Sequence, residues 1–141
     1  MTPPTNKALL DIFDQFAKSH PSTAYLSLGL SDGGYASWPD DTKLNNYDPR
    51  VRPWFKDGLA ANGPILTEPY IDSTTGETLI SAVTRFSDGG RFAGVLGGDI
   101  RLKTVADAIN TLDFNGAGYA FLLSRSGTII SHPDGQFNGK P

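Results

Sequence analysis

The sequence lacks cysteine altogether. This absence excludes disulfide bonds, metal sites built from thiolates and a cysteine nucleophile. Long apolar runs are missing too: none approaches the roughly 18 residues that a membrane-spanning helix needs. We also expect no signal peptide in the first residues. We therefore expect a soluble piece of protein.

A surplus of positive charge is also missing. Twelve Lys and Arg residues against 15 Asp and Glu give a formal net charge of −3, and the basic residues form no block. The chain thus carries no electrostatic footprint for nucleic acid and none for anionic membranes.

Motifs of the common enzyme classes are absent. The chain contains no Walker A loop, dinucleotide fingerprint, zinc-ligand spacing or EF-hand loop. Its two histidines, His20 and His132, have no nucleophile motif nearby. Paired carboxylates can hydrolyse a glycoside, but this chemistry needs one carboxyl with a raised pKa, and an arginine beside the pair favours two ionised forms. We expect no enzyme, no cofactor and no bound metal.

The residues that are present suit one folded domain. The 141 residues are 38% hydrophobic and 11% aromatic, which is enough to build a core. Sixteen glycines and ten prolines are scattered without a period, which is typical of short strands and tight turns.

Hydrophobic periodicity predicts helices over residues 6–18, 53–61 and 104–112, the last with a capping box at 104–107. Strands are predicted over 23–30, 35–38, 65–71, 78–86, 92–100, 118–124 and 128–132, with a surface loop over 39–52. Pro69 should place its strand at an edge or in a bulge. Tight turns between successive strands favour an α+β fold, with an antiparallel sheet of about five strands and helices on one side.

The segment around residue 50 gathers residue types that bind ligands. Arg52 and Trp54 flank a proline that stiffens the backbone. Arginine suits bidentate capture of a carboxylate, and tryptophan suits the wall of a pocket. Alternatively, Trp54 belongs to the core, and Arg50 and Arg52 both form ion pairs on the surface.

Three further residues are candidates. Tyr70 and Asp72 share one face of a predicted strand, because side chains two residues apart on a strand point the same way. Asp72 alternatively caps backbone amides of the Ser-Thr-Thr-Gly turn that follows it. Asp99 ends a Gly-rich apolar strand, where a buried acid needs a partner; alternatively it caps or pairs near Thr104.

Together these residues describe a site for a dipolar molecule. Arg52 would hold a carboxylate, Asp72 and Asp99 would hold an ammonium group, and the aromatic side chains would exclude water. Each charge-assisted hydrogen bond adds roughly 1.5–3 kcal/mol, so roughly four or five could support micromolar binding. The spacing along the sequence does not by itself bring these residues together.

Several motifs, in order along the chain, resemble a Cache sensor domain. They are residues 47–55, 67–72, 75–76, 94–100 (Gly-Val-Leu-Gly-Gly-Asp-Ile), 118–123 and 127–133. The resemblance is to the membrane-distal module of the double-Cache domains of methyl-accepting chemotaxis proteins, sensor histidine kinases and diguanylate cyclases.

This resemblance implies a PAS-like fold, in which helices flank a central antiparallel sheet. It implies that residues 1–22 are the remnant of an N-terminal helical segment, that 23–134 form the Cache module and that 135–141 begin a linker to a membrane-proximal module. It also implies the periplasmic part of an inner-membrane receptor, a chemotaxis transducer first of all, which as a whole is membrane-anchored and dimeric.

One branch of the family recognises amino acids through a motif that this sequence matches position by position. In that branch the arginine and tryptophan hold the ligand carboxylate, while the aspartates and a tyrosine hold the amino group. The sequence departs from the motif at Phe55, where the branch has tyrosine. The matching positions, with Phe55 included as a candidate ligand-binding residue, are Tyr47, Arg52, Trp54, Phe55, Tyr70, Asp72 and Asp99.

The resemblance leaves other ligands open. Related branches bind biogenic amines through paired acids and generally do without the arginine, so Arg52 favours an amino acid. A module without a ligand, serving structure or dimerisation, is the alternative from another class.

Overall fold

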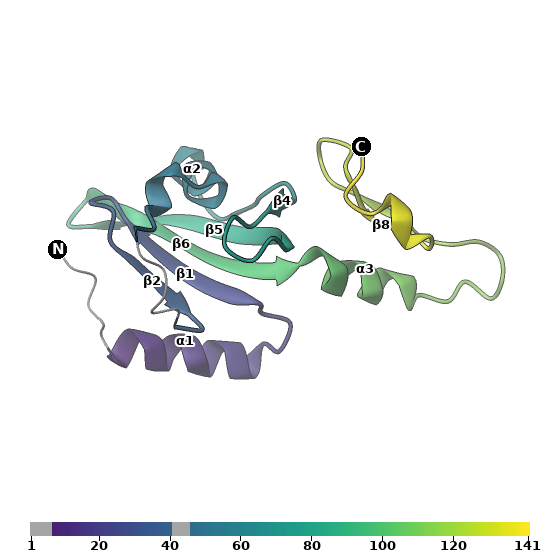
Figure 1. Ribbon diagram of the computed structural model, residues 1–141, viewed down its shortest axis with the longest axis horizontal. Helices are drawn as coiled ribbons and strands as arrows, with labels where there is room; N and C mark the ends of the chain where they lie inside the picture. Colours follow the sequence, from purple (N-terminus) through teal and green to yellow (C-terminus); the bar gives the residue numbers. More distant parts are fainter. Residues whose placement is uncertain (1–6, 41–45) are drawn as a thin grey trace. The chain divides into compact units, whose positions relative to one another are not determined.

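The computed structural model describes residues 7–40 and 46–141 of the chain (Figure 1). The helices are α1 (Lys7–Ser19), α2 (Pro53–Ala60) and α3 (Leu102–Asn110), with short 3-10 helices η1 (Pro49–Val51) and η2 (Gly135–Phe137). The strands are β1 (Tyr25–Leu30), β2 (Tyr35–Trp38), β3 (Ile65–Leu66), β4 (Tyr70–Ile71), β5 (Thr78–Asp88), β6 (Arg91–Arg101), β7 (Leu122–Leu123) and β8 (Ile129–Ser131). Within the described residues, no helix combines the length and the apolar character needed to cross a bilayer.

Six strands form one sheet in the order β2-β1-β6-β5-β3, and β4 also pairs with β5. Strand β1 runs antiparallel to both β2 and β6, and β5 runs antiparallel to both β3 and β4. Strands β7 and β8 form a separate antiparallel pair. The predicted α+β fold, with helices flanking an antiparallel sheet, is confirmed.

The chain divides into two compact units. The first comprises the residues up to Thr67 together with Ser81–Asp99, and it holds α1, α2 and most of the sheet. The second comprises Glu68–Ile80 and Ile100–Pro141, and it holds β4, α3 and the β7–β8 pair.

In the first unit the two faces of the sheet differ, because side chains alternate along each strand. Val95 on β6 points toward α2, where a methyl group added at Gly58 would meet it. Its neighbour Leu96 borders an open apolar groove of about 310 Å³, which Phe13 and Phe16 of α1 also line. Helices α1 and α2 thus lie on opposite faces (Figure 1). The prediction of helices on one side was wrong, since a helix's apolar stripe does not say which face of a sheet it covers.

Two predicted segments differ in detail from the structure. The strand predicted over 65–71 is divided into β3 and β4, and Pro69, which cannot donate a ladder hydrogen bond, lies between them. The loop predicted over 39–52 contains the helix η1. Residues 41–45 of that loop, and the predicted helix start at residue 6, lie outside the described residues.

The predicted capping box at residues 104–107 was wrong. Helix α3 already begins at Leu102, because β6 runs directly into it, and its N-cap residue Arg101 makes no side-chain capping bond. The helix buries Leu102 and Ala106, which are four residues apart, whereas Leu112 lies beyond its end. The hairpin predicted over 118–132 is present, but β7 and β8 are shorter than expected.

The close packing of α2 on the sheet predicts that Gly58→Ala destabilises the protein. A Cβ at residue 58 would lie 2.5 Å from Cγ1 of the fully buried Val95. We expect a loss of about 1–3 kcal/mol in the free energy of unfolding from overpacking, which outweighs the gain in helix propensity of about 1 kcal/mol. Urea unfolding measures the change. The matched control is Gly63→Ala, whose Cβ would meet no atom within 4 Å; equal stability of the two variants would contradict this packing.

Candidate ligand-binding site

Asp48 is the N-cap residue of helix η1, which directly precedes the candidate site residues Arg52 and Trp54. The Oδ1 atom of Asp48 accepts a hydrogen bond from the backbone N–H of Arg50 at 2.9 Å. The Arg50 guanidinium donates from Nε at 2.9 Å and from Nη2 at 2.8 Å to the same carboxylate. The alternative that the arginines form surface ion pairs is therefore correct for Arg50.

Arg52 has a different environment. Its guanidinium carbon lies 4.6 Å from the centre of the Tyr47 ring, which is a cation–π arrangement. Its Nε atom is buried and has no hydrogen-bond partner among the described residues. A buried donor without an acceptor is uncommon in folded proteins and calls for an explanation. Arg52 is thus held by an aromatic face while one of its donors still needs an acceptor.

Trp54 and Phe55 open helix α2, behind Pro53, which suits the first position of a helix. Trp54 is 5% exposed, and its Nε1 donates a hydrogen bond to Oη of Tyr47 at 3.2 Å. It therefore belongs to the core, as the alternative stated, and it also fixes Tyr47. Phe55 is 2% exposed and lies edge-on to Trp54, at 5.7 Å, and to Phe92, at 6.2 Å.

Two glycines of the sheet allow these aromatic rings to approach. A Cβ on Gly29 of β1 would lie 2.8 Å from the Phe55 ring and 2.9 Å from the Trp54 ring. A Cβ on Gly97 of β6 would lie 3.4 Å from Trp54. The absence of side chains at these positions sets the depth at which the aromatic cluster rests on the sheet.

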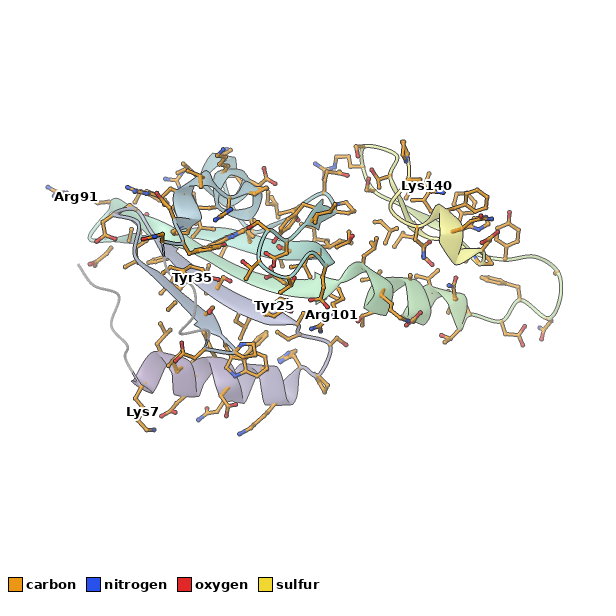
Figure 2. All side chains as sticks on the ribbon, viewed as in Figure 1. Lys7, Tyr25, Tyr35, Arg91, Arg101 and Lys140 are labelled. Atoms are coloured by element: carbon orange, nitrogen blue, oxygen red, sulfur yellow. The ribbon has the colours of Figure 1, made fainter. Side chains whose placement is uncertain are left out.

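Tyr35 belongs to the same aromatic cluster, although the sequence did not indicate it as a candidate residue. It lies on β2 (labelled in Figure 2), and its ring centre is 4.3 Å from that of Tyr47. Its hydroxyl lies 3.0 Å from Oγ of Ser27, a buried residue on β1. Burial raises the pKa of Tyr35 above its ordinary value, and the negative charge of Asp99 adds to the rise. The Tyr35 hydroxyl thus lies beside Ser27, which pairs with Gly97 of β6. Ser27, a serine within the apolar run of residues 25–30, is the feature of the sequence that could have indicated a polar neighbour for this strand.

Asp99 lies on β6, opposite Tyr25 of β1. It is 7% exposed, and its Oδ1 accepts a hydrogen bond from Oγ of Ser81 at 2.5 Å. The expectation that a buried acid here has a partner is confirmed, because Ser81 donates a hydrogen bond to it. The alternative role in capping the following helix was wrong, because the N-cap residue of α3 is Arg101.

Tyr70 and Asp72 belong to the second unit. Tyr70 pairs with Leu79 across β4 and β5. Asp72 caps the turn that follows: its Oδ2 accepts hydrogen bonds from the backbone N–H of Thr74 and from both the backbone N–H and the hydroxyl of Thr75. The capping alternative is therefore correct for this oxygen. The convergence of Tyr70 and Asp72 with the residues of the first unit stays a prediction.

The structure thus gathers Tyr47, Arg52, Trp54 and Phe55 in the first unit, which also contains Asp99. In this unit the cation contacts the aromatic cluster directly, since Arg52 stacks on Tyr47 and Tyr47 contacts Tyr35. The anion lies on the same face of the sheet: the Ser27 hydroxyl is 3.0 Å from that of Tyr35, and Ser27 pairs with Gly97, two residues before Asp99 on β6. Throughout residues 7–40 and 46–141, no three His, Asp or Glu side chains come together in a way that could hold a metal ion.

Comparison with protein families gives a match that covers most of the chain. The family described as "Methyl-accepting chemotaxis protein-like, first PDC sensor domain" matches residues 12–107. Among individual proteins, the chain is 48% identical over 107 residues to the methyl-accepting chemotaxis protein McpG of Pseudomonas putida. That alignment covers 76% of this chain and 17% of McpG.

Solved structures show the same likeness. The ligand-binding domain of the Pseudomonas fluorescens chemoreceptor CtaA, in complex with L-serine, superposes with a TM-score of 0.81 at 37% identity, over 98% of this chain and 60% of that one. The ligand-binding domain of the Pseudomonas aeruginosa amino acid chemoreceptor PctB, in complex with L-Arg, gives a TM-score of 0.80 at 39% identity, over 99% of this chain and 58% of that one. The chain therefore spans less than two thirds of each of these relatives.

The ion pair between Arg50 and Asp48 at η1 predicts that the Asp48 carboxyl has a lowered pKa. The hydrogen bonds from the Arg50 side chain are the main cause that lowers the pKa of Asp48 to about 2. Because the folded-state pKa is the lower one, the stabilisation is present above the unfolded value of about 4 and is lost as the pH falls from there toward 2. In Arg50→Ala the pKa of Asp48 should rise, as measured by the pH dependence of its carboxyl NMR signal. Asp14, which is paired with Lys18, is the control whose pKa should stay unchanged; an unchanged Asp48 would contradict the assignment.

Proposed function

The chain belongs to the family of first PDC sensor domains of methyl-accepting chemotaxis protein-like receptors, and on this premise we propose that it is an extracytoplasmic module that binds an α-amino acid. The proposal is for a binding module of a bacterial chemoreceptor and not for an enzyme. Because the chain covers 17% of McpG, the membrane anchoring, the dimeric state and the periplasmic location of the whole receptor are parts of the same proposal.

The observation that carries the proposal is the buried Nε atom of Arg52, which has no acceptor among the described residues. A guanidinium presents its donors in a fixed fork that matches the two oxygens of a carboxylate. A ligand carboxylate at Arg52 would supply the missing acceptor in a site where little water competes. Tyr47 and Trp54 restrict the motion of the arginine side chain, so less conformational entropy is lost on binding.

The ammonium end of the ligand is assigned to the acids. Asp99 is buried on the face of the sheet that carries the aromatic cluster, and it supplies a carboxylate for a cation. Asp72 is proposed as the second acid, because the turn uses only its Oδ2 in the three hydrogen bonds to residues 74 and 75. Tyr70 is proposed to line the site beside it.

The alternatives are less well supported. A biogenic amine has no carboxylate, so it would leave the Nε of Arg52 without an acceptor, and a module without a ligand would do the same. Phe55 does not weaken the proposal, because its ring packs among Trp54 and Phe92 and contributes to the scaffold of the site. Signalling by the whole receptor would require that the amino acid bind one of two receptor states more tightly.

The proposed role of the carboxylate is tested by pairs of ligands that differ only in this group. L-Serine is compared with ethanolamine and L-arginine with agmatine, by thermal unfolding of the 141-residue chain. A ligand at 100 times its dissociation constant stabilises the folded state by about 2.7 kcal/mol. We expect at least one amino acid to raise the melting temperature and its decarboxylated partner to leave it unchanged.

Two arginine variants complete this test. Arg52→Ala should abolish the shift, while Arg50→Ala, which removes a nearby arginine engaged with Asp48, should retain it. An equal shift from the amine and from the amino acid would contradict the role of Arg52. The absence of any shift across the common amino acids would overturn the proposed function.

A further inference from the structure

The buried polar side chains of the first unit lie on one face of its sheet. Side chains two residues apart on a strand point to the same face, so Ser27 shares a face with Gly29 on β1. On β6, Asp99 likewise shares a face with Val95 and Gly97. The two sets lie on one face of the sheet, because Ser27 pairs with Gly97 and Gly29 with Val95. The other face is apolar and is lined by residues such as Leu26, Ala82 and Leu96. The buried polar groups are thus confined to the face that carries the aromatic cluster.

Ser81 is the least exposed member of this polar group. It lies on β5, has 0% exposure and donates its hydroxyl hydrogen to Oδ1 of Asp99 on β6. Both partners are on central strands of the sheet, which are the most rigid positions that the fold offers.

Thr67 holds the backbone of Ser81 through two hydrogen bonds. The N–H of Ser81 donates to Oγ1 of Thr67 at 3.0 Å, and the N–H of Thr67 donates to the carbonyl oxygen of Ser81 at 2.9 Å. Thr67 is itself buried. The backbone that carries the Ser81 side chain is therefore fixed by hydrogen bonds, and the hydroxyl itself is held by its bond to Asp99.

Stability alone does not account for this pair. A buried carboxylate is costly even when it is hydrogen-bonded, and an apolar pair of the same shape is often as stable or more so. The pair has a clear use if the carboxylate must meet a cation in a fixed direction, because preorganised groups lose less entropy on binding.

We infer that Ser81 is a positioning residue, which fixes the Asp99 carboxylate toward the ammonium group of the ligand. This inference rests on the proposed function, since it names a residue that acts on the same site through Asp99. Ser81 holds one carboxylate oxygen, so the rotation of the carboxylate is restricted before the ligand arrives.

The test compares three variants of the 141-residue chain by calorimetric titration with L-serine and L-arginine. We expect Ser81→Ala to weaken binding about tenfold, which corresponds to 1.4 kcal/mol. Ser81→Thr, which keeps a hydroxyl, should recover most of this loss. The matched control is Ser131→Ala: Ser131 is also a serine of 0% exposure, but its hydroxyl donates to the Ala106 carbonyl oxygen at 3.2 Å. Its loss should leave affinity within about twofold, a change of about 0.4 kcal/mol by the same conversion.

The possible outcomes distinguish failure of the positioning role of Ser81 from failure of the proposed amino acid binding. Binding by the unaltered chain together with unchanged affinity in Ser81→Ala would overturn the positioning role alone. Equal losses in Ser81→Ala and Ser131→Ala, matched by equal falls in melting temperature, would assign Ser81 a purely structural role and would also overturn the inference. Failure of the unaltered chain to bind any amino acid would overturn the proposed function and this inference with it.

Discussion

The confinement of buried charge and polarity to one face of a sheet is the constraint on which the rest of this structure depends. A guanidinium nitrogen of Arg52 and the carboxylate of Asp99 are both removed from water in the first unit. Taking such groups out of water is costly unless each finds a partner. Asp99 has Ser81, whereas the Nε of Arg52 has no acceptor among the described residues. This asymmetry is the basis of the proposal that a ligand supplies the acceptor for the Nε of Arg52.

The fold makes this arrangement possible by placing small residues under large aromatic ones. Gly29 and Gly97 allow the rings at the start of α2 to rest directly on β1 and β6. Trp54 then fixes Tyr47 through a hydrogen bond, and the Tyr47 ring supports the Arg52 guanidinium. In this chain the sheet therefore supports the Arg52 guanidinium through Trp54 and Tyr47, and the apolar groove beside α1 lies on the opposite face of the sheet.

Local patterns in the sequence predicted much of this, and non-local contacts account for what was missed. Periodicity predicted helices and strands at the places of α1, α2, β1, β2, β5 and β6, but it did not predict η1 or the division of residues 65–71 into β3 and β4. The types of residue around position 50 pointed to a site. Only the family resemblance distinguished Arg52 from Arg50 as the motif residue, because by residue type either could have paired with an acid. In the structure the turn of η1 brings Asp48 to Arg50. Tyr35 and Ser81 were missed because their roles depend on which strands pair, and strand pairing brings together residues far apart in the chain. Local turn chemistry, in contrast, correctly indicated that Asp72 caps the turn after β4.

A crystal structure of the 141-residue chain with a bound L-amino acid is the most direct measurement of the central claim. The account predicts a ligand carboxylate oxygen within about 3.2 Å of the Arg52 Nε atom, which is the range of an N–H···O hydrogen bond. It also predicts the ligand ammonium at the carboxylate of Asp99. An amino acid bound with its carboxylate elsewhere, or a water molecule at Nε in the liganded protein, would contradict it.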